Sequence, residues 1–375
     1  MSPKSRFSDR VDRIDISGIR KIFESATSDA INLGLGQPDF DTPSHIKRAA
    51  VDAINEGFTG YTEGAGMPEL KEAISRKFKS ENNFIALSEE ILVTSGASEA
   101  LHLAIQALVG GGDEILMPDP GFVSYSALAE VADGKLVGVP LREDLSMDPE
   151  EVKERITKKT KAFIVNSPAN PTGAVQTEDD MRAFAEIADD QNITLISDEV
   201  YEHLIYEGEH ESPARFGENV ITINAVSKTY AMTGWRLGYL AARKEYIEQM
   251  LKIHSYIQAC AQSVSQKAAI AALNGPQGCV KEMRDEFKRR RDFVAQSLRE
   301  MGLSFSPPKG AFYIFPKVRD EVKMVEELLK NGVIVTPGSA FGEYGRDHMR
   351  ISYATSMQNL KDAFGIIKRV LDINP

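Results

Sequence analysis

The chain has 375 residues, of which 42% are hydrophobic and 26% are charged; these fractions exclude disordered, collagen-like and coiled-coil classes. At about 150 residues per domain, the length predicts two domains, or one large domain with a satellite. The formal net charge is −11, from 44 Lys and Arg against 55 Asp and Glu, which disfavours a nucleic-acid-binding surface.

Cysteine, histidine and apolar patterns disfavour three further classes. Cys260 and Cys279 are too few for a disulfide framework and lack metal-ligand spacing, and the six histidines form no His-x-x-x-His pair. We therefore expect no zinc site. No apolar stretch follows residues 1–6, and no window approaches about 18 uninterrupted apolar residues, so we expect neither a signal peptide nor a membrane span. The sequence predicts a cytoplasmic protein without membrane or nucleic-acid partners.

Helical and strand patterns alternate along the middle of the chain. Helices are expected over 44–55, 68–78, 98–108, 125–131 and 148–156 and from Thr177 onward, because apolar residues recur there at helical spacing or capping residues begin a turn. Strands are expected over 91–94, 114–117, 135–139, 162–165, 194–197, 220–224 and 238–242. Several strands are almost entirely apolar, as in a parallel sheet with helices on both faces. Residues 45–275 are thus expected to form a doubly wound, mainly parallel α/β domain.

The pattern changes after Gly275. A long charged helix over 280–301 and an apolar segment over 311–315 are followed by a helix over 321–330, strands over 333–335 and 349–353, and a last helix over 356–371. The basic run Lys288-Arg289-Arg290-Arg291 is expected on a solvated helix face. Residues 276–375 are predicted to form a smaller α+β domain, which residues 1–44 join.

Residues with useful chemistry follow one expected strand after another. In an open α/β sheet, ligands bind at the carboxyl ends of the strands. The turn 95–98 lies between a strand and a helix N-terminus, where exposed N–H groups attract an anion. Asn170, Asp198, Tyr201 and Lys228 come after three further strands. The Asn170 amide, the Asp198 carboxylate, the Tyr201 phenol and the Lys228 amine are therefore expected close together, at the carboxyl-terminal edge of the sheet.

Two common phosphate-binding motifs are absent. No Gly-x-Gly-x-x-Gly follows the first strand, and no Gly-x-x-x-x-Gly-Lys-Ser/Thr occurs anywhere. An anion site beside a nucleophilic lysine and a buried aspartate indicates a pocket for pyridoxal phosphate. In such a pocket the lysine forms a Schiff base, and the aspartate keeps the pyridine nitrogen protonated.

Four segments resemble, in the family's order, the signature of class I aminotransferases, which are pyridoxal phosphate enzymes of fold type I. They are 170–173 (Asn-Pro-Thr-Gly), 197–201, 227–239 and 350–354. The resemblance runs from residue 33 to the C-terminal helix and points to the prokaryotic and archaeal branch that includes aspartate and aromatic aminotransferases. It implies the aspartate-aminotransferase fold, a pyridoxal 5′-phosphate cofactor and a homodimer with shared active sites.

The resemblance also implies a role for each matched residue. Lys228 would carry the Schiff base and then act as a base, and Asp198 would pair with the pyridine nitrogen. Tyr201 and Asn170 would hydrogen-bond the cofactor's phenolic oxygen, and the ring of Phe122 would stack on the cofactor. Taken singly, these residues also fit ordinary structural roles, such as a helix cap, a turn or a core aromatic.

The anionic groups of cofactor and substrate have their own matched residues. Arg350 would bind the substrate's α-carboxylate in a bidentate pairing. The backbone of Gly36 and the side chains of Asn170 and Phe122 would also contact the substrate. The cofactor phosphate would be bound by Gly96, Ala97, Ser98, Ser227 and Arg236, and by Tyr61 reaching across from the neighbouring subunit.

The leading functional hypothesis is transfer of an amino group from an amino acid to 2-oxoglutarate. Some aspartate-specific relatives carry a lysine at the position of Ser98, and others a partner arginine in the region that here is 252–256; neither cation is present. Arg20 is a substitute candidate for the distal carboxylate. We therefore expect an aspartate- or glutamate-using enzyme that also tolerates aromatic or other apolar donors. An aromatic aminotransferase, a β-lyase or decarboxylase, and a cofactor-binding regulator are the alternatives.

Overall fold

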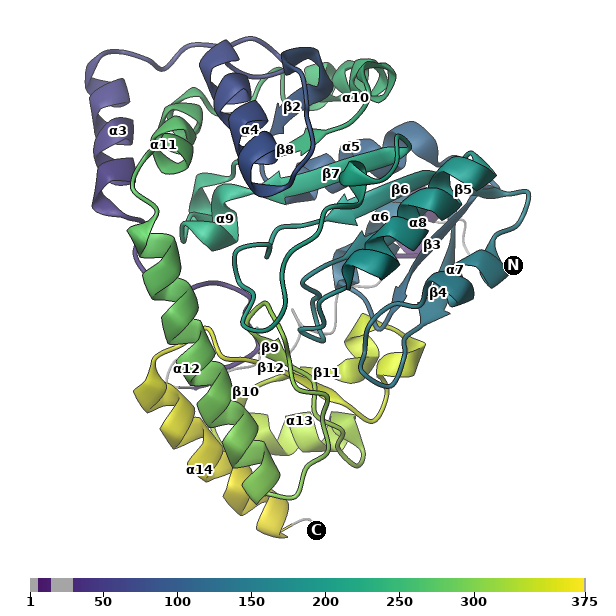
Figure 1. The fold of residues 1–375 in the computed structure, drawn as a ribbon. Coiled ribbons are helices and arrows are strands. Elements are labelled where there is room, and N and C mark those ends of the chain that lie inside the picture. Colours follow the sequence, from purple (N-terminus) through teal and green to yellow (C-terminus); the bar gives the residue numbers. More distant parts are fainter. Residues whose placement is uncertain (1–5, 15–29, 374–375) are drawn as a thin grey trace.

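The computed structural model describes residues 6–14 and 30–373, and its centre is a seven-stranded sheet (Figure 1). Its strand order is β2-β8-β7-β6-β5-β3-β4. The strands are β2 (Ile91–Thr94), β3 (Glu114–Asp119), β4 (Lys135–Pro140), β5 (Thr160–Asn166), β6 (Thr194–Asp198), β7 (Val220–Ala225) and β8 (Gly238–Ala241). Each predicted strand is present within a few residues of its expected bounds.

Helices cover both faces of this sheet, as the apolar strands predicted. On one face, α5 (Ala97–Leu108), α6 (Val123–Val131) and α10 (Lys244–Ile257) pack on side chains such as Ile164. On the other face, α7 (Pro149–Arg155) and α8 (Glu178–Gln191) pack on the alternate side chains, including Phe163 and Val165. Near β2 and β8 the cover consists of α3 (Ser44–Asn55), α4 (Pro68–Glu81) and α11 (Ser263–Asn274) (Figure 1).

Strand β8 departs from the parallel pattern, because it runs antiparallel to both β2 and β7. The connection from β7 to β8 contains only the short helix α9 (Val226–Thr229) and a single 3-10 turn at Thr233–Trp235. A parallel return requires a crossover that spans a face of the sheet, usually a full helix. The chain therefore turns back beside β7. This connection carries Lys228 and Arg236.

A second body of structure follows the long helix α12 (Gly278–Glu300), which runs from the region of α3 and α11 down to α14 (Met357–Ile373) (Figure 1). It contains a three-stranded antiparallel sheet of order β11-β12-β9, formed by Thr336–Pro337, Met349–Ser352 and Tyr313–Ile314, with α13 (Glu321–Lys330). In the described part of the N-terminal segment, β1 (Ile31–Asn32) pairs in parallel with β10 (Val333–Ile334), whereas α1 (Asp9–Asp12) lies against α6.

The basic run on α12 is solvated only in part: Lys288 and Arg289 are exposed, as predicted, whereas the prediction was wrong for Arg290 and Arg291. Arg290 is 5% exposed and Arg291 is 6% exposed. Arg290 forms ion pairs with Glu286 and with Asp39, which is distant in sequence. Arg291 pairs with Glu207 and Asp292. Acidic partners from other segments make burial of these two guanidinium groups possible.

Among the described residues, no helix combines the length and apolar character that crossing a bilayer would require.

Candidate active site

A cavity of about 290 Å³ lies at the carboxyl ends of β5, β6 and β7, beside the N-terminus of α5. Its lining includes most of the residues proposed from sequence: Gly36, Ala97, Ser98, Phe122, Asn170, Asp198, Tyr201, Ser227, Lys228, Arg236 and Arg350. Tyr61 does not line the cavity of its own chain and is 89% exposed. The fold thus brings residues from seven or more chain segments to one rim, as expected for an open α/β sheet.

Lys228 lies in α9, directly after β7, and its amine donates a hydrogen bond to the carbonyl of Gly36. Burial lowers the pKa of this amine to about 8, and the nearby charges of Arg350 and Arg236 act in the same direction. A lysine with such a pKa has a usable fraction of unprotonated amine near neutral pH. Burial therefore favours the unprotonated amine, which is the form that can act as a nucleophile or accept a proton.

Asp198 is the last residue of β6 and is 4% exposed. Its Oδ2 accepts a hydrogen bond from the hydroxyl of Tyr125 at 2.7 Å, and its Oδ1 accepts a long one from the backbone N–H of Val200 at 3.4 Å. Burial raises the pKa of this carboxyl group to about 6, against the lowering effect of the Tyr125 hydrogen bond. Burial thus disfavours the charged carboxylate, and a cation beside it would stabilise the charge.

Arg350, on β12, enters the cavity from the second body of structure. It donates to the side-chain oxygen of Asn170 at 2.9 Å and to the carbonyl of Gly34. Its guanidinium lies 4.6 Å from the ring centre of Tyr313, and its Nε is buried without a partner. None of the described carboxylates forms an ion pair with it. This arginine is therefore free to bind an anion.

Asn170 and Tyr201 are themselves held by polar neighbours. The backbone N–H of Asn170 donates to Asn166 at 2.8 Å, and Asn166 donates to the carbonyl of Asp198 at 2.9 Å. The hydroxyl groups of Tyr201 and Tyr313 lie 2.9 Å apart. Burial raises the pKa of Tyr201 well above its usual value, so its phenol stays protonated.

The turn before α5 and the first residues of that helix lie at one end of the cavity. Gly96 is the N-cap of α5 at φ 85°, and a Cβ there would lie 2.6 Å from Nη2 of Arg236. Arg236 is anchored by hydrogen bonds to the carbonyls of Thr233 (3.0 Å) and Ser95 (3.3 Å). Ser98 and Arg236 are exposed, so this end is open in the single chain. Helix N–H groups and a guanidinium together suit a phosphate.

Several residues in or beside the cavity were not given a role by the sequence analysis. Tyr125 lies beside the cavity and contacts Asp198; the sequence placed it only at the start of a helix, three residues after Phe122. Tyr313 lines the cavity and belongs to the segment 311–315, which the sequence analysis described only as apolar. Asn166, Thr233 and the backbone of Gly34 also line the cavity. Arg20, proposed for the distal carboxylate, lies outside the described residues.

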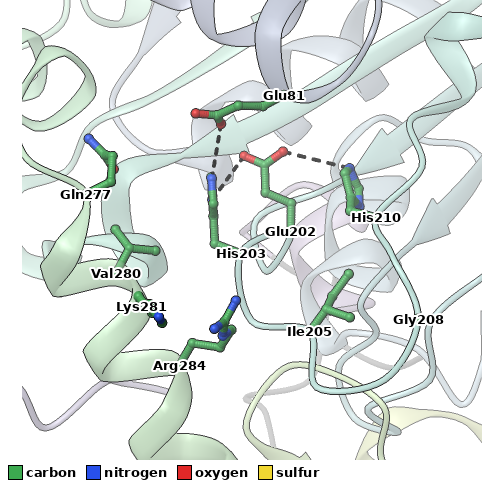
Figure 2. Close-up of a pocket in the computed structure, with 10 residues that line it drawn as sticks. All are labelled: Glu81, Glu202, His203, Ile205, Gly208, His210, Gln277, Val280, Lys281 and Arg284. Atoms are coloured by element: carbon green, nitrogen blue, oxygen red, sulfur yellow. Dashed lines mark hydrogen bonds and ion pairs between the residues drawn. The ribbon is translucent and has the colours of Figure 1, made fainter.

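A second, larger cavity of about 440 Å³ is lined by residues from the end of α4, the segment after β6 and the start of α12, and is shown in Figure 2. Its histidines face carboxylates: His203 Nε2 lies 3.1 Å from Glu81, and His210 Nε2 lies 3.8 Å from Glu202. Glu202 also forms an ion pair with the buried Lys77. Most of these acids and bases pair with one another, although His210 Nδ1 is buried without a partner. The smaller cavity contains Lys228, Arg236 and Arg350, which form no ion pairs with described carboxylates, so it is the better candidate for an active site.

Comparison with known proteins identifies the family of this chain. A family model described as aminotransferase class I and II matches residues 28–367. The chain belongs to the class I and II aminotransferases. This aminotransferase is 49% identical over 374 residues to a probable aspartate aminotransferase of Methanocaldococcus jannaschii, covering 97% of this chain and 100% of the relative. It is 41% identical to aromatic-amino-acid aminotransferase 2 of Thermococcus litoralis, covering 97% of this chain and 98% of that protein.

Solved structures confirm the expected aspartate-aminotransferase fold. A double mutant of the aspartate aminotransferase of Thermus thermophilus matches with a TM-score of 0.93 at 39% identity, covering 98% of this chain and 100% of that chain. A Pyrococcus protein matches with a TM-score of 0.95 at 44% identity, covering 98% of each chain.

Aminotransferases of this class use pyridoxal 5′-phosphate, and the described residues fit that group. A largely buried lysine of lowered pKa suits its aldehyde, and the buried Asp198 suits its ring nitrogen. The α5 N-terminus and Arg236 suit its phosphate. The buried Nε of Arg350, which has no partner, leaves capacity for a substrate carboxylate in the same cavity.

Proposed function

We propose that this aminotransferase moves an amino group from an L-amino acid, with aspartate favoured, to 2-oxoglutarate, using pyridoxal phosphate bound to Lys228. The observation that carries the proposal is that Lys228 shares one cavity with two cations, Arg236 beside the N-terminus of α5 and Arg350 on β12, neither of them ion-paired to a described carboxylate. One cation suits the cofactor's phosphate and the other suits a substrate's carboxylate. The amine would then share the cavity with both bound anions and with the reacting carbon.

Each residue of the cavity has a proposed task. When bound, the cofactor supplies an electron sink for the bond broken at the substrate's α-carbon. Lys228 carries the Schiff base and, once displaced, moves the proton at that carbon, for which a pKa of about 8 suits it. Asp198 holds a proton on the ring nitrogen. Tyr201 and Asn170 donate toward the phenolic oxygen, and the ring of Phe122 covers one face.

We further propose that Gly96, Ala97, Ser98, Ser227 and Arg236 bind the phosphate and that Tyr61 of a second copy completes this end. The exposure of Tyr61 in the single chain supports this proposal, as does the openness of the phosphate end. A homodimer with shared sites would place one chain's Tyr61 over the other chain's phosphate. The proposed functional division is a cofactor-binding domain over 45–275 and a smaller domain formed by 276–375 with 1–44.

The proposed preference for aspartate draws on the relatives' names, since those at 49% and 44% identity are named for aspartate. The described lining residues contain three cationic side chains, Lys228, Arg236 and Arg350, and each already has a task. A distal carboxylate would therefore be bound by neutral donors, by the neighbouring chain or by Arg20. The apolar wall of Leu35, Leu101 and Phe122 favours aromatic donors as the second candidate.

A donor panel tests the proposal. The purified enzyme with pyridoxal phosphate is given single amino acids with 2-oxoglutarate, and glutamate formation is measured. We expect turnover with aspartate and slower turnover with tyrosine and phenylalanine. Fast turnover of the aromatic donors beside negligible turnover of aspartate would favour the aromatic alternative. Release of ammonia with pyruvate or a similar fragment indicates a lyase, and binding without release of a keto acid indicates a regulator. We also infer a cytoplasmic location, where these metabolites meet.

A further inference from the structure

We propose that Tyr125 is a positioning residue for Asp198. Its hydroxyl fixes which carboxylate oxygen faces the cavity and stabilises the charged carboxylate by a direct hydrogen bond. This inference rests on the proposed role of Asp198 toward the ring nitrogen. Tyr125 does not line the cavity, so it would act through Asp198 and not on the substrate.

The hydrogen bonds of Asp198 distinguish its two oxygens. Oδ2 accepts the Tyr125 hydroxyl at 2.7 Å, the length of a strong charge-assisted O–H···O⁻ bond. Oδ1 accepts only the Val200 N–H, at 3.4 Å. Since the phenol occupies Oδ2, Oδ1 is the oxygen with capacity left for a further donor. A protonated ring nitrogen is such a donor.

Packing holds Tyr125 in this position. The residue lies on α6 and is 1% exposed. Its ring packs edge-to-face against the ring of Phe122, with a centroid distance of 5.5 Å and an interplanar angle of 85°. Phe122 is the N-cap of the same helix and lines the cavity. A single helix end therefore carries both the ring proposed to cover the cofactor and the donor that orients the aspartate. The position of this helix end would therefore determine both the stacking of Phe122 on a bound cofactor ring and the orientation of Asp198 toward its nitrogen.

The charges around Asp198 keep Tyr125 a donor. Burial and the charge of Asp198 raise the pKa of the Tyr125 phenol well above its usual value, so the hydroxyl stays protonated throughout the working range of pH. The other groups that act on Asp198 are Glu199, which raises its pKa, and Lys228, which lowers it. Against them, Tyr125 stabilises the charged carboxylate by direct contact. A carboxylate that stays charged can hold a proton on its partner nitrogen.

Tyr125→Phe tests the inference because it removes the hydroxyl and keeps the ring. In the cofactor-free protein, the Asp198 carboxyl is titrated by carbon-13 NMR and assigned by loss of its signal in Asp198→Asn. A hydrogen bond to a charged group is worth about 1.5–3 kcal/mol, so the variant should bind a proton at Asp198 about ten- to a hundredfold more tightly. The matched control is Tyr230→Phe, which removes another buried hydroxyl, one bonded to Gln277 at 2.9 Å. It should leave the Asp198 titration unchanged.

The loaded enzyme gives a second, separate measurement. Tyr125→Phe should lower kcat about tenfold while the KM for the amino donor stays within about twofold, because the substrate contacts are untouched. Tyr125→His, whose ring N–H can also donate, should recover part of both effects and serves if the phenylalanine variant folds poorly. An unchanged Asp198 titration in Tyr125→Phe overturns the inference. Absence of transamination in the wild-type protein would instead refute the proposed function, and the NMR result would still stand.

Discussion

The guanidinium of Arg350 donates a hydrogen bond to the side-chain oxygen of Asn170 at 2.9 Å, across 180 positions of sequence. Arg350 belongs to the small sheet, whereas Asn170 follows β5 of the large sheet. This contact therefore joins the two bodies of structure at the cavity itself. A substrate carboxylate bound at Arg350 would lie at the same junction, so substrate binding and the relative placement of the two bodies are expected to influence each other.

Lys228→Ala should fold normally and lose transamination. The amine provides both the proposed covalent link and the proton transfer, and no other lysine lines the cavity among the described residues. The half-reaction is followed by the absorbance of the bound cofactor after addition of amino acid, with circular dichroism as the check on folding. Repeated turnover without an added amine would contradict the assignment.

Asp198→Asn should retain the cofactor's phosphate contacts and lose most of the rate. Removing a preorganised electrostatic group of this kind costs about 3 kcal/mol in the transition state, or about a hundred- to a thousandfold in kcat. Asp179→Asn, at an exposed carboxylate on α8, is the matched control and should react at the wild-type rate. If both variants turn over equally, Asp198 has no such role.

Gly96→Ala should weaken cofactor binding. The glycine adopts φ 85°, and an added methyl group would lie 2.6 Å from Nη2 of Arg236, so both the turn and the guanidinium must shift. We expect affinity for pyridoxal phosphate to fall by about tenfold or more, measured by fluorescence titration of the cofactor-free protein. Gly234→Ala has nothing within 4 Å of its added methyl group and should bind normally. Equal affinities would argue against a phosphate at this turn.

The stability of the cofactor-free protein should depend on pH through Lys228. Burial lowers the pKa of this amine in the folded state to about 8, from a reference value of 10.5. Below pH 8 the buried charge destabilises the fold; between about 8 and 10.5 the folded state binds fewer protons than the unfolded state, so stability rises with pH. Lys228→Met should therefore be the more stable protein at pH 7, by about 3 kcal/mol at most, and the difference should shrink toward pH 10. Denaturant unfolding of both proteins across this range checks the trend, and a constant difference would contradict it.

Tyr61 should act on the neighbouring subunit. Tyr61→Phe chains are mixed with Lys228→Ala chains under conditions that allow subunits to exchange. If sites are shared, each hybrid contains one site with a wild-type Lys228 from one chain and a wild-type Tyr61 from the other. The mixture should then regain cofactor affinity and activity that neither parent has. No gain on mixing, or a fully active monomer by light scattering, would rule out sharing.

Local sequence was sufficient for most of the elements and for the rim of the site. Apolar strands such as 91–94 and 162–165 were predictable because residues buried on both faces leave an uninterrupted apolar run. The anion-binding turn at Gly96 and the strand-end positions of Asp198 and Lys228 were predictable because ligands collect at the carboxyl ends of strands. The family's motifs supplied the roles, and these local features depend on short stretches of chain.

Other features depend on contacts between distant segments. The antiparallel β8, the burial of Arg290 against Asp39, and the His–Glu cluster around Glu202 have no local signature. The same is true of the hydrogen bond from Tyr125 to Asp198, which joins α6 to the end of β6. Charges and phenols acquire partners, and their pKa values shift, only when folding removes water and brings those segments within bonding distance. The spacing of residues in the sequence predicts which residues lie at the cavity, whereas the three-dimensional packing determines which of them are in contact.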